Sequence, residues 1–148
     1  MHKSDVVAAL LAGLRDELAS LERLTQAARD EATSPESRPE NKYDTRATEA
    51  SYLAVGQGQR MVALRRLTAF LETDGRVDLF HVEGAKGEAW FLLAPDGGGR
   101  RLAVAGDEVV VVTAESPVGG ALVGAQAGDS VRLGPPGAAL DYEVLAVS

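Results

Sequence analysis

The chain has 148 residues, which suits one domain or two small ones. It contains no cysteine, and this excludes a disulfide framework, thiolate catalysis and the ligands of most structural zinc sites. Only His2 and His81 carry imidazole, so a His-rich metal site or a Ser-His-Asp triad is hard to assemble. No apolar run approaches the ~18–20 residues of a membrane span, and the N-terminus lacks the pattern of a signal peptide. We therefore expect a cytoplasmic protein that has no membrane partner.

The net charge of −7 is distributed unevenly along the chain. Residues 1–73 contain 10 basic and 11 acidic side chains, whereas residues 74–148 contain 5 and 11. Thirteen of the 16 glycines also lie in the second half. An acidic chain without a basic stripe lacks the lysine and arginine that bind phosphates, so we expect no direct sequence-specific binding to nucleic acid. The change in composition predicts two differently built domains, 1–74 and 75–148.

Residues 4–32 have the periodicity of a helix with one narrow apolar seam. The seam positions step alternately by four and three residues, and they are Val7, Leu11, Leu14, Leu18, Leu21, Thr25 and Ala28. This heptad spacing predicts a helix that buries the seam against a second helix. Ser4 is expected to cap its N-terminus.

A second helix is predicted after the proline-rich turn at residues 33–39. Ser37 and Glu40 have the spacing of a capping box, so the helix is expected to start there. Its seam consists of Ala50, Leu53, Leu64, Leu67 and Leu71. Gln57 and Arg60 interrupt this seam. We interpret Gly56 and Gly58 as places where the two helices approach closely.

Two seams of matched length joined by a short turn predict an antiparallel coiled-coil hairpin over residues 1–74. The second helix is expected to end at residues 73–75, where glycine can form a C-cap. About 30 residues per arm give a rod of ~45 Å. Its tip, near residues 33–45, is acidic. Such charge runs are usually solvated helix ends, but here the cluster would lie at the far end of a protruding rod.

The second half is predicted to be a small sheet domain with one short helix, which makes the fold class α+β. Short apolar runs bounded by turns predict strands over residues 77–82, 89–93, 102–104, 109–113, 131–133 and 142–147. Ser116 and Pro117 predict the start of the helix, and Gly124 predicts its end. His81 has no acidic or hydroxyl partner at a suggestive spacing, so we expect a strand residue without a chemical role. Trp90 is expected in the core.

The end of the chain resembles the C-terminal signature of the bacterial Gre transcript-cleavage factors. The residues that carry the resemblance are Ser116-Pro117-Val118-Gly119-Gly120-Ala121-Leu122-Val123-Gly124, then Gly128-Asp129-Ser130-Val131 and Tyr142-Glu143-Val144. In that family a coiled-coil hairpin precedes a domain of FKBP-like fold. The resemblance thus implies an FKBP-like antiparallel sheet domain over residues 75–148.

The resemblance also implies a function and a partner. A Gre-like protein binds bacterial RNA polymerase, inserts its hairpin into the secondary channel and stimulates cleavage of backtracked transcripts. The docking residues implied here are Ser116, Pro117, Val118 and Leu122. The tip carboxylates Glu40, Asp44 and Glu36 would act in catalysis, with Glu40 and Asp44 holding a Mg²⁺ of the polymerase. Such a protein is a monomer, has no cofactor of its own and is not itself an enzyme, although exposed seams could also pair two chains.

The tip departs from the family pattern, which runs roughly D-x-x-E-N-x-E-Y. Glu40-Asn41-Lys42-Tyr43 has one residue fewer, and Ser37 stands where the leading aspartate would be. Two alternatives to cleavage therefore stay open. The chain could inhibit or regulate the polymerase through the same channel without activating cleavage, or it could be an interaction or chaperone module of FKBP-like fold.

Overall fold

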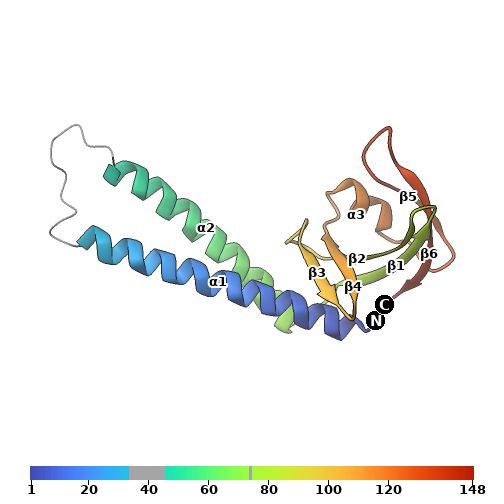
Figure 1. The fold of residues 1–148 in the computed structure, drawn as a ribbon, viewed down its shortest axis with the longest axis horizontal. Coiled ribbons are helices and arrows are strands. Elements are labelled where there is room, and N and C mark those ends of the chain that lie inside the picture. The colour runs from blue at the N-terminus through green and yellow to red at the C-terminus, as the bar shows by residue number, and fades with distance from the viewer. Residues whose placement is uncertain (34–45, 74) are drawn as a thin grey trace. The chain divides into compact units, whose positions relative to one another are not determined.

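A computed structural model describes residues 1–33, 46–73 and 75–148. These residues form helices α1 and α2, then a six-stranded sheet with the short helix α3, which confirms the α+β class (Figure 1). The chain divides into two compact units. One consists of Ala12–Ala69, and the other consists of Met1–Leu11 together with Phe70–Ser148. Within the described residues, no helix combines the length and apolarity that a membrane span requires.

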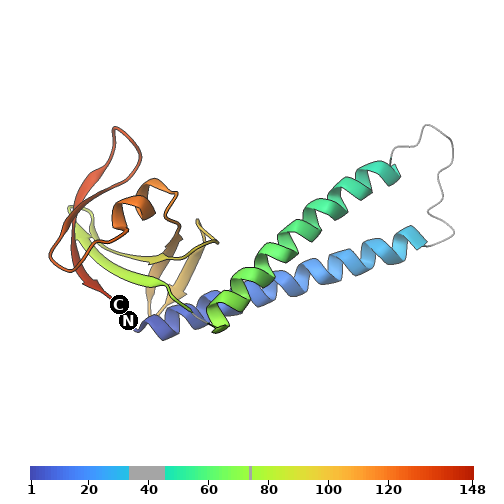
Figure 2. The same ribbon diagram turned by 180° about the vertical axis from the view of Figure 1, so that it is seen from behind.

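The unit of residues 12–69 is made of two long helices that run in opposite directions (Figure 2). Helix α1 is Lys3–Thr33 and helix α2 is Arg46–Thr73, so both predicted helices are confirmed. Side chains connect them: the Arg60 Nε donates to Glu17 Oε1 at 2.7 Å, and the Arg65 Nη2 donates to Glu22 Oε1 at 3.0 Å. Such exposed ion pairs contribute at most about 1 kcal/mol each. The buried hydrophobic residues described in this unit are Leu14, Leu64 and Leu67.

The buried stripe at the start of α1 differs from the predicted one. Leu14 is buried as predicted, but the other buried residues are Val6 and Leu10, whereas the predicted Val7 and Leu11 are only half-buried. Three residues spaced by four form one ridge of a helix. This ridge is favoured because residues 1–11 belong to the sheet unit, so that unit, rather than α2, sets which side of α1 is buried there.

The seam of α2 is confirmed in its second half and wrong at Leu53, while the side chain of Ala50 lies outside the described part of the structure. Leu64, Leu67 and Leu71 are buried, but Leu53 is 67% exposed. The predicted close approach at Gly56 and Gly58 is also wrong, because a Cβ added at either position would meet no atom within 4 Å. Polar residues interrupt the seam between Leu53 and Leu64, and the apolar face there is too sparse to close against α1.

The helix ends show one wrong and one correct prediction. Ser4 lies inside the first turn of α1, and the carbonyl of His2 accepts from the N–H groups of Asp5 and Val6 at 3.1 and 3.3 Å. The predicted end of α2 is confirmed at Thr73. Gly75 follows with a φ of +57°, and its N–H donates to the Phe70 carbonyl at 2.9 Å. The predicted capping box of Ser37 and Glu40 lies outside the described residues.

The sheet has six strands in the order β3-β4-β2-β1-β6-β5, which confirms the six predicted segments. The strands are β1 Asp78–Gly84, β2 Gly87–Leu93, β3 Arg101–Val104, β4 Asp107–Val112, β5 Ser130–Leu133 and β6 Leu140–Val147. Helix α3 is Pro117–Leu122 and lies between β4 and β5 in the sequence.

The sheet is mixed rather than wholly antiparallel as expected. Strands β2 and β4 are parallel, with pairs from Trp90 and Val109 to Leu93 and Val112. The reason is the tight β3–β4 hairpin, whose turn residues Ala105 and Gly106 both have positive φ. This hairpin places β3 at the outer edge, so β4 becomes the neighbour of β2 and runs in the same direction.

Both faces of the central strands are buried. One face contributes to a core that includes α3, and its buried members are Phe80, Val82, Val112, Leu122, Leu133 and Val144. On the other face Leu79, Leu92, Val109 and Val111 are at most 1% exposed. Full burial of a side chain of this size stabilises the fold by about 1.5–3 kcal/mol. The same compact unit contains buried residues from the first turns of α1 and the last turn of α2, so the base of both helices is built into it.

Candidate functional site

The segment that carries the sequence signature forms the N-terminal cap of α3. Ser116 is the cap residue, with a φ of −77° and a ψ of 153°. Its Oγ accepts from the Gly119 N–H at 3.0 Å and donates to the Thr113 carbonyl at 2.7 Å. Pro117 occupies the first turn, where its missing N–H costs no hydrogen bond. The first half of the signature thus has a local structural role.

Gly119 is required by a very close approach between α3 and the segment that follows β4. A Cβ at this position would lie 1.9 Å from the Thr113 carbonyl oxygen, which is backbone and cannot rotate away. Gly120 is less constrained, since its Cβ would lie 3.2 Å from the Ala114 oxygen. The glycine of the S-P-x-G sequence therefore fixes how closely the helix sits on the sheet.

The four predicted docking residues differ in how accessible they are. Leu122 is fully buried and belongs to the core. Ser116 and Val118 are half-buried, and Pro117 is exposed. Val123 directly follows α3 and is 55% exposed, which makes it the most accessible large apolar side chain of this segment. Its exposure depends on how α3 lies on the sheet, so it could not be predicted from the sequence. Docking itself stays a prediction.

The second half of the signature forms a turn that is tied to β6. The Asp129 Oδ2 accepts from the Gln126 N–H at 2.8 Å, and the Asp129 carbonyl accepts from the Val144 N–H at 2.8 Å. Gly128 has a φ of +93° and donates its N–H to the Val144 carbonyl at 2.8 Å. The glycine and the aspartate thus connect the start of β5 to the strand beside it.

The predicted catalytic carboxylates Glu36, Glu40 and Asp44 lie outside the described residues. Their suggested role in holding Mg²⁺ therefore stays a prediction. Within residues 1–33, 46–73 and 75–148, no three histidine, aspartate or glutamate side chains gather in a way that could hold a metal ion.

His81 has an acidic partner, so the expectation that it has none is wrong. Its Nε2 lies 2.8 Å from Glu88 Oε2, and its ring stacks on Trp90 with centroids 3.9 Å apart and an interplanar angle of 3°. The β1–β2 register pairs His81 with Trp90 and Glu83 with Glu88, which puts Glu88 diagonally across from His81 on the same face. The signal was available, because a two-residue turn at Ala85 and Lys86 fixes this register.

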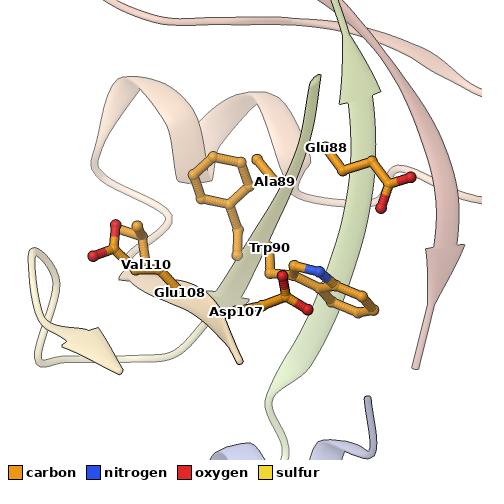
Figure 3. A pocket seen from close by; sticks show the side chains of 7 residues that line it. Glu88, Ala89, Trp90, Asp107, Glu108 and Val110 are labelled. Carbon is orange, nitrogen blue, oxygen red and sulfur yellow. The ribbon is translucent and has the colours of Figure 1, made fainter. Parts of the chain in front are cut away.

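Trp90 is half-buried, so its predicted place in the core is only partly correct. It lines a pocket of about 220 Å³ together with Glu88, Ala89, Phe91, Asp107, Glu108 and Val110 (Figure 3). Strands β2 and β4 supply all of these residues. The sequence analysis did not anticipate this pocket, because it depends on the parallel pairing of two strands that are separated by a hairpin strand.

Comparison with known proteins yields similar structures but no matching sequences. No family model matches the chain, and no curated protein does so. Among solved structures, Gfh1 of Thermus thermophilus, described as GreA factor homolog 1, is 17% identical over 96% of this chain and 92% of its own, with a TM-score of 0.37. A structure described as the transcription factor Gfh1 is 17% identical over 94% of this chain and 93% of its own, also with a TM-score of 0.37.

Gfh1 of Thermus aquaticus gives nearly the same values. It is 17% identical over 92% of both chains, with a TM-score of 0.36. Similarity at this level carries no argument about activity. The case for a function therefore depends on this chain's own residues.

Proposed function

We propose that this chain is a Gre-like transcription factor that binds bacterial RNA polymerase. The observation that carries the proposal is the signature from Ser116 to Val144. It resembles the Gre signature at fixed offsets over a long segment. Three residues of the signature have distinct structural roles in the sheet unit. Ser116 caps α3, Gly119 allows the close approach to Thr113, and Asp129 accepts a hydrogen bond in the turn before β5. A chance match would not be expected to satisfy so many separate structural requirements.

The pair of long helices also supports this proposal. Helices α1 and α2 have 31 and 28 residues, which corresponds to about 45 Å at 1.5 Å per residue. We infer that the end carrying residues 34–45 enters the secondary channel of the polymerase. In this proposal the sheet unit docks at the channel entrance, with Pro117 and its neighbours in contact with the polymerase.

The proposed chemistry is stimulation of transcript cleavage by the polymerase itself. Glu40, with Asp44 or Glu36, would help to hold a Mg²⁺ in the polymerase active site. In two-metal phosphoryl chemistry one ion activates the attacking oxygen and the other stabilises the leaving oxygen. Carboxylates suit Mg²⁺, because this hard cation is bound by one or two protein oxygens and keeps several waters. The chain would then supply ligands to another protein's active site and would not be an enzyme on its own.

A second function is supported by the composition of the tip. Ser37 stands where the family has an aspartate, and the segment Glu40-Asn41-Lys42-Tyr43 is one residue short. A tip with fewer carboxylates in altered places would enter the channel without completing the metal site. The chain would then inhibit or regulate the polymerase through the same channel.

Stalled elongation complexes distinguish these functions. We expect the wild-type protein with Mg²⁺ to shorten the stalled transcript from its 3′ end, and we expect Glu40→Ala to reduce this cleavage while leaving polymerase binding nearly unchanged. The matched control is Glu31→Ala, which removes an exposed carboxylate that lies before the tip on α1. Equal loss of cleavage and binding in Glu40→Ala would mean that Glu40 is structural. Slower elongation without cleavage would support the regulatory function. No effect of the protein on the elongation complex would contradict both the cleavage function and the regulatory function.

A further inference from the structure

The pocket between β2 and β4 lies where the two parallel strands begin to pair. Their first pair is Trp90 with Val109. Glu88 and Asp107 come before this pair, where no pairing holds the strands together, and the space between them opens into the pocket of about 220 Å³. All residues that line it belong to one compact unit.

The pocket is rich in negative charge. Glu88, Asp107 and Glu108 supply three carboxylates to its lining. Among the described residues, the guanidinium of Arg101 contacts one of them, since its Nη1 donates to Glu108 Oε1 at 2.5 Å. Glu88 is held by His81 at 2.8 Å. The carboxylates thus outnumber the guanidinium, and this imbalance favours a cationic occupant.

An aromatic wall accompanies the charge. His81 stacks on the indole of Trp90 at a centroid distance of 3.9 Å, which holds the ring in a fixed orientation. Asp107 also lines the pocket, and it lies two residues before Val109, the strand partner of Trp90, on the same face of the sheet as the indole. A cation placed against an aromatic face is attracted by its quadrupole, and a planar guanidinium can also form forked hydrogen bonds to a carboxylate. An indole next to a carboxylate is therefore a better match to arginine than to lysine.

The pocket is small. Its volume of about 220 Å³ lies below the range of about 300–1,000 Å³ that is usual for small-molecule and cofactor pockets. A metal ion is not favoured either, since the described residues contain no group of three side chains suited to one. A single long side chain fits the volume, the charge and the aromatic wall together.

We propose that this pocket receives an arginine side chain of a partner protein. The guanidinium lies against Trp90 and forms hydrogen bonds with Asp107 and Glu88, which the strand register places on the same face of the sheet as the indole. The identity of the partner as RNA polymerase rests on the function proposed above. The pocket is separate from the Ser116–Val123 segment in sequence and provides a second contact on the same unit.

The arginine site can be tested without the polymerase, because Trp90 is the only tryptophan of the chain. The probe is acetyl-Gly-Arg-Gly-amide, added while the fluorescence of Trp90 is recorded. We expect a saturable change with a Kd of about 1 mM, and we expect Asp107→Asn to weaken binding at least about fivefold. The same peptide with citrulline, which has nearly the same shape and no charge, should give no saturable change. An equal response to both peptides, or no response to either, overturns the proposal.

The second measurement tests the partner. In a titration with core RNA polymerase, Asp107→Asn should bind at least about fivefold more weakly than wild type. The control variant is Asp78→Asn, which neutralises an exposed carboxylate on β1 outside the signature, and it should bind as wild type does. Equal binding by wild type and Asp107→Asn overturns the arginine contact and leaves the proposed function intact. Failure of wild type to bind polymerase overturns the proposed function and the assignment of the partner.

Discussion

Ser116 uses both hydrogen-bonding capacities of one hydroxyl to hold the start of α3. It accepts from the helix at Gly119 and donates to the strand side at Thr113. The helix and the end of β4 are thereby joined through one atom. Because α3 supplies Leu122 to the core, the cap also affects how well the sheet unit is packed.

We predict that Ser116→Ala lowers the free energy of unfolding by about 1 kcal/mol, the usual cost of losing a serine cap. The reason is that the Gly119 N–H loses its acceptor, while the Thr113 carbonyl loses the hydroxyl but keeps the backbone N–H of residue 116 as a donor at 3.0 Å. Urea unfolding followed by the fluorescence of Trp90 measures this change. Ser130→Ala, at an exposed position in β5, is the control and should have little effect. Equal stability of Ser116→Ala and wild type would show that the cap contributes nothing.

Val123 should contribute to docking without contributing to stability. Its side chain is 55% exposed, so an aspartate there removes no core contact. We predict that Val123→Asp weakens binding to core RNA polymerase about tenfold or more, because a charge is buried in the interface, while the melting temperature stays unchanged. Native binding titration and thermal unfolding together check this. Unchanged affinity would place the docking surface elsewhere.

At the residue scale, the sequence predicted features set by neighbours along the chain. The cap at Ser116 and the C-terminal glycine at Gly75 are examples, since their partners are three to five residues away. The sequence did not predict side-chain pairs that depend on strand register, such as His81 with Glu88. Nor could it predict that Leu122 is fully buried while Val123 is exposed, because this depends on how α3 lies on the sheet.

Helix α2 shows at the element scale how a regular pattern can mislead. Leu53 is in phase with Leu64, Leu67 and Leu71, yet it is largely exposed. Phase alone decides which side of a helix faces its partner, but burial also requires that the partner comes close. The open space around Gly56 and Gly58 shows that it does not come close there.

Gly58→Ala should therefore stabilise the helical unit. The new methyl group meets no atom within 4 Å, and alanine is favoured over glycine in a helix interior by about 1 kcal/mol. Thermal unfolding followed by circular dichroism at 222 nm should show a higher midpoint. Gly75→Ala is the opposing control, since its φ of +57° penalises any side chain and the midpoint should fall. A lower midpoint for Gly58→Ala would indicate that the helices approach closely at this level.

The strands were predictable individually, but their order was not. Short apolar runs between turns gave all six segments, because each run reflects local alternation and turn chemistry. The parallel pairing of β2 with β4 arises from the way the β3–β4 hairpin folds back, and no local pattern encodes that. The pocket beside Trp90 is a consequence of this pairing, so it could not be predicted either.

At the scale of the whole molecule, the division into units differs from the division in composition. Composition changes near residue 74, but Met1–Leu11 and Phe70–Ser148 form one compact unit. The buried residues Val6, Leu10 and Leu71 explain the difference, since they add the bases of both helices to that unit. The helical unit of Ala12–Ala69 is thus continuous in sequence with the sheet unit at both of its ends.

RNA polymerase binding is the property on which the proposed function depends, and a titration measures it directly. The full chain, labelled at an introduced cysteine in place of Ser148, is mixed with increasing core RNA polymerase at low salt, and the anisotropy of the label is followed. We predict saturable binding of one chain per polymerase with a Kd of about 1 µM or lower, and we expect the Kd to rise about tenfold or more when Val123 is replaced by aspartate. No saturable change at tens of micromolar polymerase would contradict the proposed function.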